Sequence, residues 1–327
     1  MKDDWWRTGK MLVKGITVAY DDVGEGDNVL VLVHGHPFNR TMWRPQMEWI
    51  EGFNRARARA RPRSEGVDGL TGLEGLRGDV GIEPSMHSNF EHEDEHEHED
   101  EGKPTWRAIV PDLRGYGESA VVPGKTTLDI FASDIAGLLD ELAIQNVVIG
   151  GLSMGGQIVM AFCRLYPERV RGILLAATFC RAETEEGRRQ RAAMADRLLK
   201  EGMEPYAEEV LPKMVTPANL IALPGVADHV RGMMRATNPK GAAAALRGRA
   251  ERPDYAKTLA RLDVPALVVV GDEDAFTTRA DAEQMSTLLK GSELVWIEGV
   301  GHMPNLESEG EFNEAMERLL ERCAKEK

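Results

Sequence analysis

Short, continuous apolar runs recur along the chain and are separated by longer amphipathic stretches. The apolar runs predict strands that are buried on both faces, and the amphipathic stretches predict helices. Their alternation is typical of an α/β protein with a mostly parallel sheet and helices on both of its faces. The predicted strands are residues 29–33, 106–110, 147–150, 172–176, 266–270 and 293–297, and the predicted helices are residues 126–143, 156–166, 278–290 and 309–325.

Two other parts of the chain depart from this alternation. Residues 11–22 predict a pair of antiparallel edge strands that turn at Gly15. Several helical stretches follow one another from residue 181 to about residue 252 without a strand, which we interpret as a helical cap over the sheet edge. No internal repeat relates the two halves, so we predict one α/β domain over residues 1–327, with substrate specificity located in the cap.

Residues 52–103 are unusual in composition. They begin with alternate arginines, continue with a glycine at every third position, and end in an acidic, histidine-rich run. Because large apolar residues are few, we predict a flexible, low-complexity surface insertion in the domain. His92 and His96 have the spacing of metal ligands on a helix, with His98 nearby, so weak binding of a divalent metal is the alternative to a simply solvated run.

Composition and charge restrict the classes of partner. A hydrophobic content of 42% supports a sizeable core, and the formal net charge of −14 argues against nucleic acid or an anionic membrane surface as a partner. No apolar segment reaches the ~20 residues of a membrane helix, and no apolar signal segment opens the sequence, so we expect a cytoplasmic protein. Cys163, Cys180 and Cys323 are too widely spaced to indicate a disulfide framework or a zinc site.

A serine flanked by glycines directly follows the predicted strand at residues 147–150. A sharp turn from strand to helix strains the serine backbone and leaves no room for side chains two residues away, and Gly151 and Gly155 supply that room. The pattern predicts a nucleophile elbow that exposes the Ser153 hydroxyl, with a helix starting at Gly155 or Gly156 that points its positive end at the reaction centre. An ordinary Gly-Ser turn is the alternative, because the pentapeptide alone is common.

A serine nucleophile needs a histidine base and a carboxylate that orients it. Three acidic residues, Asp272, Glu273 and Asp274, follow one predicted strand, and His302 follows the next. The carboxyl ends of parallel strands lie at one edge of the sheet, so these residues are expected near Ser153. We favour Asp274 as the carboxylate because it lies farther from its strand and can bend toward His302. Asp272 remains the alternative, with stabilisation of a turn as its other role, and His302 could instead be a structural histidine.

Acyl transfer also needs backbone donors for the oxyanion of the tetrahedral intermediate. One donor is predicted to be the N–H of Met154, the residue after the nucleophile. The other is expected in the loop after the strand at residues 29–33. Pro37 has no N–H, which leaves His36 as the best donor.

Together these motifs resemble the capped α/β-hydrolases, a family that includes esterases, enol-lactone hydrolases, C–C bond hydrolases and haloperoxidase-type perhydrolases. The chain order Ser, Asp, His is also that of the family. The resemblance covers nearly the whole chain apart from residues 52–103, where relatives have a short connection. It implies the α/β-hydrolase fold with a helical cap, the triad Ser153, Asp274 and His302, an oxyanion hole formed by His36 and Met154, and no metal or organic cofactor. The motifs are residues 34–37 (His-Gly-His-Pro), 111–119 (Pro-Asp-Leu-Arg-Gly-Tyr-Gly-Glu-Ser), 151–156 (Gly-Leu-Ser-Met-Gly-Gly), 271–274 (Gly-Asp-Glu-Asp) and 301–304 (Gly-His-Met-Pro).

These features predict a hydrolase that cleaves a small to medium carboxylic ester or lactone through an acyl-serine intermediate. By the pattern of the family it resembles, the single glycine before His36 implies unhindered substrates rather than esters of tertiary alcohols. Serine at position 153 argues against haloalkane dehalogenases and epoxide hydrolases, which usually carry aspartate there. The alternatives are a C–C bond hydrolase or perhydrolase with the same triad, and a receptor-type α/β-hydrolase that only captures a ligand.

Overall fold

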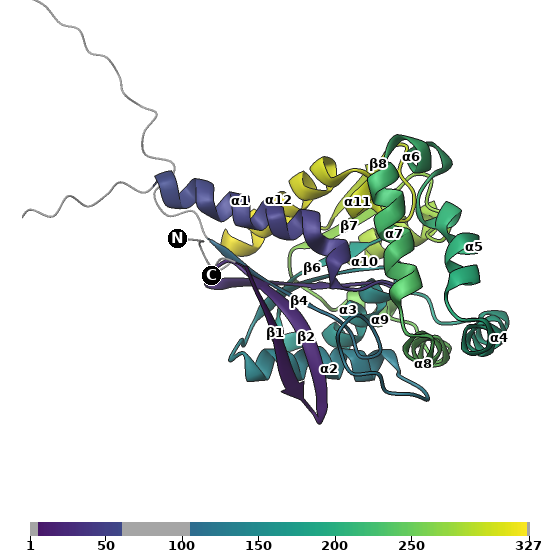
Figure 1. The fold of residues 1–327 in the computed structure, drawn as a ribbon. Helices are drawn as coiled ribbons and strands as arrows, with labels where there is room; N and C mark the ends of the chain where they lie inside the picture. Colours follow the sequence, from purple (N-terminus) through teal and green to yellow (C-terminus); the bar gives the residue numbers. More distant parts are fainter. Residues whose placement is uncertain (1–5, 61–104, 326–327) are drawn as a thin grey trace, which may run out of the picture.

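A single mixed sheet forms the centre of the molecule (Figure 1). The structure is a computed structural model that describes residues 6–60 and 105–325. Within them the strand order is β1-β2-β4-β3-β5-β6-β7-β8, in which β1 and β2 form an antiparallel edge hairpin, β2 pairs antiparallel with β4, and all other pairs are parallel. The predicted α/β-hydrolase architecture is confirmed. The strands are β1 (Trp6–Val13), β2 (Ile16–Val23), β3 (Asn28–Val33), β4 (Trp106–Pro111), β5 (Val147–Leu152), β6 (Val170–Ala176), β7 (Ala266–Gly271) and β8 (Glu293–Ile297).

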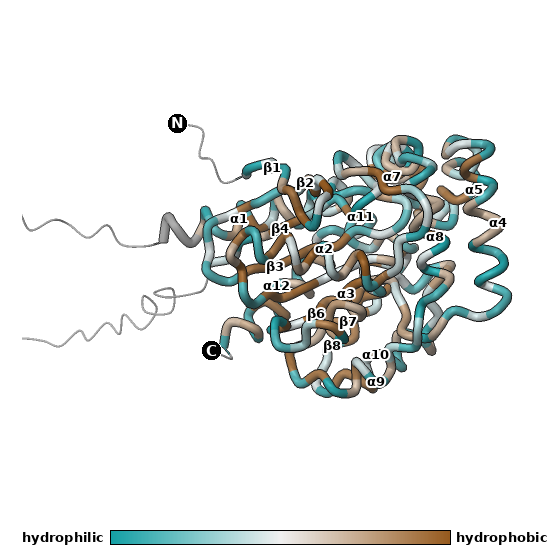
Figure 2. The backbone as a smooth tube through the Cα atoms, turned by 90° about the horizontal axis from the view of Figure 1, so that it is seen from below, coloured by the Kyte–Doolittle hydropathy of each residue, from teal (hydrophilic) through white to brown (hydrophobic). Residues whose placement is uncertain are grey.

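Helices bury both faces of this sheet. Leu30 and Leu32 of β3 belong to one buried cluster, and Val29, Val31 and Val33 belong to another, because successive strand residues point to opposite faces. This is why the strand is apolar at every position, and Figure 2 shows the central strands as the most hydrophobic part of the fold. The first cluster packs on α1 (Arg44–Ala60) and α12 (Glu309–Lys325), and the second on α2 (Leu128–Glu141), α3 (Met154–Leu165) and α10 (Arg279–Leu288).

The helical segment between β6 and β7 contains no strand, as predicted. Its first five helices are grouped together at one end of the molecule (Figure 1), and a short sixth helix, α9 (Ala256–Leu259), leads into β7. Threonine or asparagine caps three of them, since the side chains of Thr184, Thr216 and Asn238 accept backbone N–H groups of the first turn. The first five helices are α4 (Glu185–Glu201), α5 (Glu204–Met214), α6 (Pro217–Ala222), α7 (Pro224–Ala236) and α8 (Pro239–Arg249).

Two predicted helix boundaries are wrong. Helix α3 begins at Met154, before the glycines proposed as its start. Helix α1 continues to Ala60, so residues 52–60 are helical and do not belong to a loop. Asn54 anchors this part of α1 to β4, because its buried side-chain amide donates to the Trp106 carbonyl at 2.7 Å and its oxygen accepts the Trp106 N–H at 3.1 Å. The rest of the predicted insertion, including His92, His96 and His98, lies outside the described residues.

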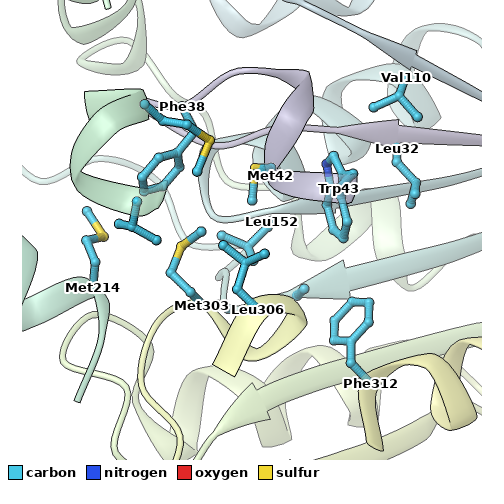
Figure 3. Packing of buried hydrophobic residues seen from close by; sticks show 14 of the residues in the cluster. Leu32, Phe38, Met42, Trp43, Val110, Leu152, Met214, Met303, Leu306 and Phe312 are labelled. Atoms are coloured by element: carbon cyan, nitrogen blue, oxygen red, sulfur yellow. The ribbon is translucent and has the colours of Figure 1, made fainter. Parts of the chain in front are cut away.

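Residues next to the predicted site share one packed cluster. Phe38, Met42, Leu152 and Met303 are fully buried and converge in Figure 3. Leu152 precedes Ser153, Met303 follows His302, and Phe38 lies in the loop that carries His36. The cluster therefore fixes three loops relative to one another by close packing. Within the described part of the chain, no helix has the length and apolarity needed to cross a bilayer.

Candidate active site

Ser153 occupies a strained turn between β5 and α3. Its φ of +57° and ψ of −113° lie in a region that few non-glycine residues adopt. The turn is held on both sides, because the Ser153 N–H donates to the Ala176 carbonyl at 2.9 Å and the Thr178 hydroxyl donates to the Ser153 carbonyl at 2.8 Å. The predicted strand-to-helix elbow is thus present.

The two glycines that flank this turn have no room for side chains. A Cβ at Gly151 would lie 2.4 Å from the Gly155 carbonyl carbon, and a Cβ at Gly155 would lie 2.1 Å from the Val33 carbonyl oxygen. Both contacts involve backbone atoms, which cannot move away as a flexible side chain could. The glycines therefore permit the close approach of β5, α3 and β3, as the sequence pattern predicts.

We expect Gly155→Ala to destabilise the fold by about 1–3 kcal/mol, because the added methyl group overlaps the Val33 carbonyl. Gly232→Ala is the matched control. Gly232 is exposed within α7, and a Cβ there meets no atom within 4 Å, so alanine should stabilise the protein by about 0.5–1 kcal/mol through helix propensity. Urea unfolding measures the free energy of unfolding of the two variants and of the wild-type protein. Equal stability of the two variants would contradict the tight elbow.

Asp274 and His302 form a buried pair from the loops after β7 and β8. The His302 Nδ1 atom lies 2.9 Å from Asp274 Oδ1 and 3.0 Å from Oδ2. The N–H groups of Phe276 and Thr277 also donate to Oδ1, at 2.8 and 3.2 Å. Burial by itself would raise the pKa of Asp274, but the charge and hydrogen bond of His302 and the two amide donors hold it below its usual value. Asp274 is therefore an ionised carboxylate in hydrogen-bond contact with the imidazole.

The other two acidic residues of this loop point elsewhere. Asp272 is exposed, and its Oδ1 accepts the Gly299 N–H at 2.8 Å. This contact joins the two loops but does not involve His302. Glu273 is also exposed. Asp274 is thus the acidic residue of the three that the structure joins to His302, while Asp272 has the turn-stabilising contact considered as its alternative role.

Ser153 and His302 line one cavity of about 520 Å³, which is also lined by residues of α4 and α5. Met194 of α4 and Met214 of α5 belong to its wall, and flexible thioethers suit a wall that accepts varied apolar shapes. Among the described residues, no hydrogen bond joins the Ser153 hydroxyl to the His302 imidazole. Such hydrogen bonds commonly tighten only when substrate is bound. The site is therefore identified by the cavity that both residues line.

The predicted oxyanion donors lie next to this cavity. Within residues 6–60 and 105–325, the backbone N–H groups of His36 and Met154 have no hydrogen-bond acceptor. For Met154 this follows from its place as the first residue of α3, where backbone donors have no partner within the helix. Two unpaired donors beside the elbow are suited to binding a negatively charged oxygen.

The His36 imidazole is itself part of the cavity wall. Its Nδ1 lies 2.8 Å from the Tyr116 hydroxyl, and its buried Nε2 has no partner among the described residues. Burial, followed by the positive charges of Arg249 and Arg191, holds the pKa of His36 well below its usual value. The ring is therefore neutral and contributes polarity to the cavity without charge.

Two buried carboxylates support the site, and the sequence analysis assigned no role to either. Asp112 accepts the backbone N–H of Arg40 at 2.8 Å and also pairs with the Arg40 guanidinium, which fixes the helical turn after the His36 loop. Glu307 accepts the N–H groups of Gly301 and Met303, at 3.1 and 3.2 Å, on both sides of His302. Asp112 belongs to the motif at residues 111–119, so the sequence indicated its position. Glu307 lies in none of the sequence motifs and could not have been found from them.

Comparison with known proteins agrees with the observed architecture. Residues 30–315 match a family model described as "Alpha/beta hydrolase family". A thermophilic esterase from Thermogutta terrifontis, solved with malate bound, is 31% identical, and the match covers 97% of this chain and 99% of that one with a TM-score of 0.78. The protein belongs to the α/β-hydrolase family.

Two further relatives are named as enol-lactonases. 3-Oxoadipate enol-lactonase 2 of Acinetobacter baylyi is 28% identical over 65% of this chain and 78% of its own length. The enol-lactonase from Burkholderia xenovorans LB400 is 22% identical, covers 95% of this chain and 99% of its own, and has a TM-score of 0.74. The second similarity concerns the fold alone.

Proposed function

We propose that this protein hydrolyses a small to medium carboxylic ester or lactone through an acyl-serine intermediate. The observation that carries the proposal is the shared cavity, in which the strained Ser153 elbow and the Asp274-paired His302 lie together. A cavity of about 520 Å³ falls within the range of small-molecule sites. Relatives named as an esterase and an enol-lactonase support ester and lactone bonds as the target.

In the proposed mechanism, Asp274 holds the proton of His302 on Nδ1 and leaves Nε2 free to act as the base. His302 takes the Ser153 proton as the serine oxygen bonds to the carbonyl carbon. The amides of His36 and Met154 bind the oxyanion, and the ionised Asp274 stabilises the imidazolium. His302 then protonates the leaving alcohol, and a water molecule releases the acyl group by the same steps.

A panel of esters and lactones of graded size tests this function, combined with a fluorophosphonate probe and mass spectrometry of the labelled peptide. We expect turnover of several unhindered esters or lactones and labelling at Ser153. A dienol-type diketone in the panel tests C–C bond cleavage. Absence of ester and lactone turnover, with cleavage of the diketone or with ligand binding alone, would refute the proposed bond.

A further inference from the structure

Arg249, at the end of α8, is a buried cation in the wall of the active-site cavity. Its side chain is part of that wall, and the residue is only 8% exposed. Its Nε donates to the neutral Gln157 Oε1 at 3.0 Å, and it has no ion pair with any described residue. The buried polar atoms that lack a partner do not include its two terminal nitrogens, so these nitrogens retain surface that opens into the cavity.

The neighbouring charges do not neutralise Arg249. Glu183 is a buried carboxylate of the same cavity wall, and it already pairs with both Arg191 and Arg252. Three guanidinium groups therefore share one carboxylate. The other carboxylates of the cavity wall, Glu186 and Glu209, pair with Arg189 at 2.6 Å and Arg197 at 2.7 Å on the outside of the cap.

This excess of positive charge is unfavourable without an anion. Burial, together with the charges of Arg191 and Arg252, lowers the pKa of Arg249 well below its usual value. Burial also lowers the pKa of Arg252, to about 10. A buried cation without a counter-ion destabilises a protein strongly. An anion that enters the cavity can therefore form an ion pair with the Arg249 guanidinium that no described carboxylate forms.

Arg249 lines the same cavity as Ser153 and His302. After burial, its charge is the largest influence on the pKa of three residues from separate parts of the fold, His36, Tyr116 and Tyr206. His36 belongs to the predicted oxyanion loop, and Tyr206 lies on α5 in the cavity wall. An anionic group bound by Arg249 would thus occupy the same cavity as an ester carbonyl at Ser153.

We propose that the substrate carries a free carboxylate, which the Arg249 guanidinium binds inside this cavity. The inference rests on the proposed ester or lactone hydrolysis and specifies its substrate class. The planar fork of arginine matches the two oxygens of a carboxylate and can form two parallel hydrogen bonds. The arginine therefore selects acidic esters over neutral esters of the same shape.

Two pairs of substrates test the effect of the substrate carboxylate, because the two members of each pair differ in charge but have nearly the same shape. Monoethyl glutarate is compared with ethyl 5-methylhexanoate, and 4-acetoxybutanoate with 4-methylpentyl acetate, so an isopropyl group replaces the carboxylate on the acyl or the alcohol side. We expect wild-type kcat/KM to favour the acid in at least one pair. Arg249→Met should reduce that acid-to-neutral ratio roughly 10- to 100-fold, the size of a charge-assisted hydrogen bond.

A matched control and a second variant separate recognition from folding. Arg247 lies on the same helix but pairs with Asp196 at the surface, so Arg247→Met should leave the ratio unchanged. Gln157→Glu places a carboxylate beside Arg249 with almost no change in shape, and it should also reduce the ratio. This variant tests the proposal even if Arg249→Met fails to fold.

Calorimetric titration with glutarate tests the arginine independently of catalysis. We expect glutarate to bind the wild-type protein and to bind Arg249→Met and Gln157→Glu more weakly. If no ester is hydrolysed but this pattern holds, the proposed reaction fails and the carboxylate site stands. If esters are hydrolysed without preference for an acid in either pair, or if neither variant changes the ratio, the carboxylate site is refuted and the esterase remains.

Discussion

Replacing Ser153 by alanine is expected to lower kcat by a factor on the order of 10⁴ or more, because the variant has no oxygen to form the acyl intermediate. The fold should remain intact. Among the described residues the serine hydroxyl makes no hydrogen bond, while the backbone contacts with Ala176 and Thr178 do not depend on the side chain. Steady-state kinetics on the best ester of the panel measures the loss, and urea unfolding measures stability.

Fluorophosphonate labelling provides the internal check on this result. The wild-type protein should be labelled and Ser153→Ala should not be. Ser308→Ala is the matched control, because Ser308 is a serine whose hydroxyl donates to Glu311 at 3.0 Å on the exterior of the protein. Esterase turnover near the wild-type level in Ser153→Ala, or labelling that persists in it, would exclude Ser153 as the nucleophile.

Asp274→Asn is expected to lower kcat about 10⁴-fold as well, although the asparagine side chain has nearly the same size and shape as the aspartate. The amide no longer fixes the proton of His302 on Nδ1, so Nε2 is not held in the form that accepts the serine proton. The imidazolium also loses the charge that stabilises it. The loss should therefore appear in kcat and kcat/KM together.

Asp272→Asn provides the matched comparison for this variant. Asp272 lies two residues away and contacts the Gly299 amide at 2.8 Å, which an asparagine oxygen can still accept. We expect its activity to stay within about threefold of wild type, since surface changes of this kind cost little. A loss confined to Asp272→Asn would transfer the orienting role to Asp272 and refute the assignment to Asp274.

The hydrophobic pattern predicted the sheet well because each strand is buried on both faces. All six predicted parallel strands occur, and β8 has the predicted bounds of 293–297. Helix ends were predicted less well. Gly155, near the start of α3, lies against Val33, and Asn54 within α1 is hydrogen-bonded to Trp106, and both partners are distant in sequence.

The motifs predicted that Ser153, Asp274 and His302 lie at one edge of the sheet, and in the structure the His302 Nδ1 atom lies 2.9 Å from Asp274 Oδ1. Glu307 and Arg249 could not be predicted as parts of the site. A lone glutamate or arginine on a helix is usually solvated, and only the fold shows that these two are buried. Their neighbours, Gly301 and Met303 for one and Gln157 for the other, give them their roles.

The α/β architecture, the glycine-flanked turn at Ser153 and the order of the three polar residues along the chain could all be predicted before the fold was known. These are local properties, because strand burial and turn geometry are encoded in neighbouring residues. The carboxylate that faces His302 and the cations that line the cavity became evident only from the folded protein. Such pairings depend on how distant segments pack, and the free energy of a buried charge is set by whichever groups that packing places beside it.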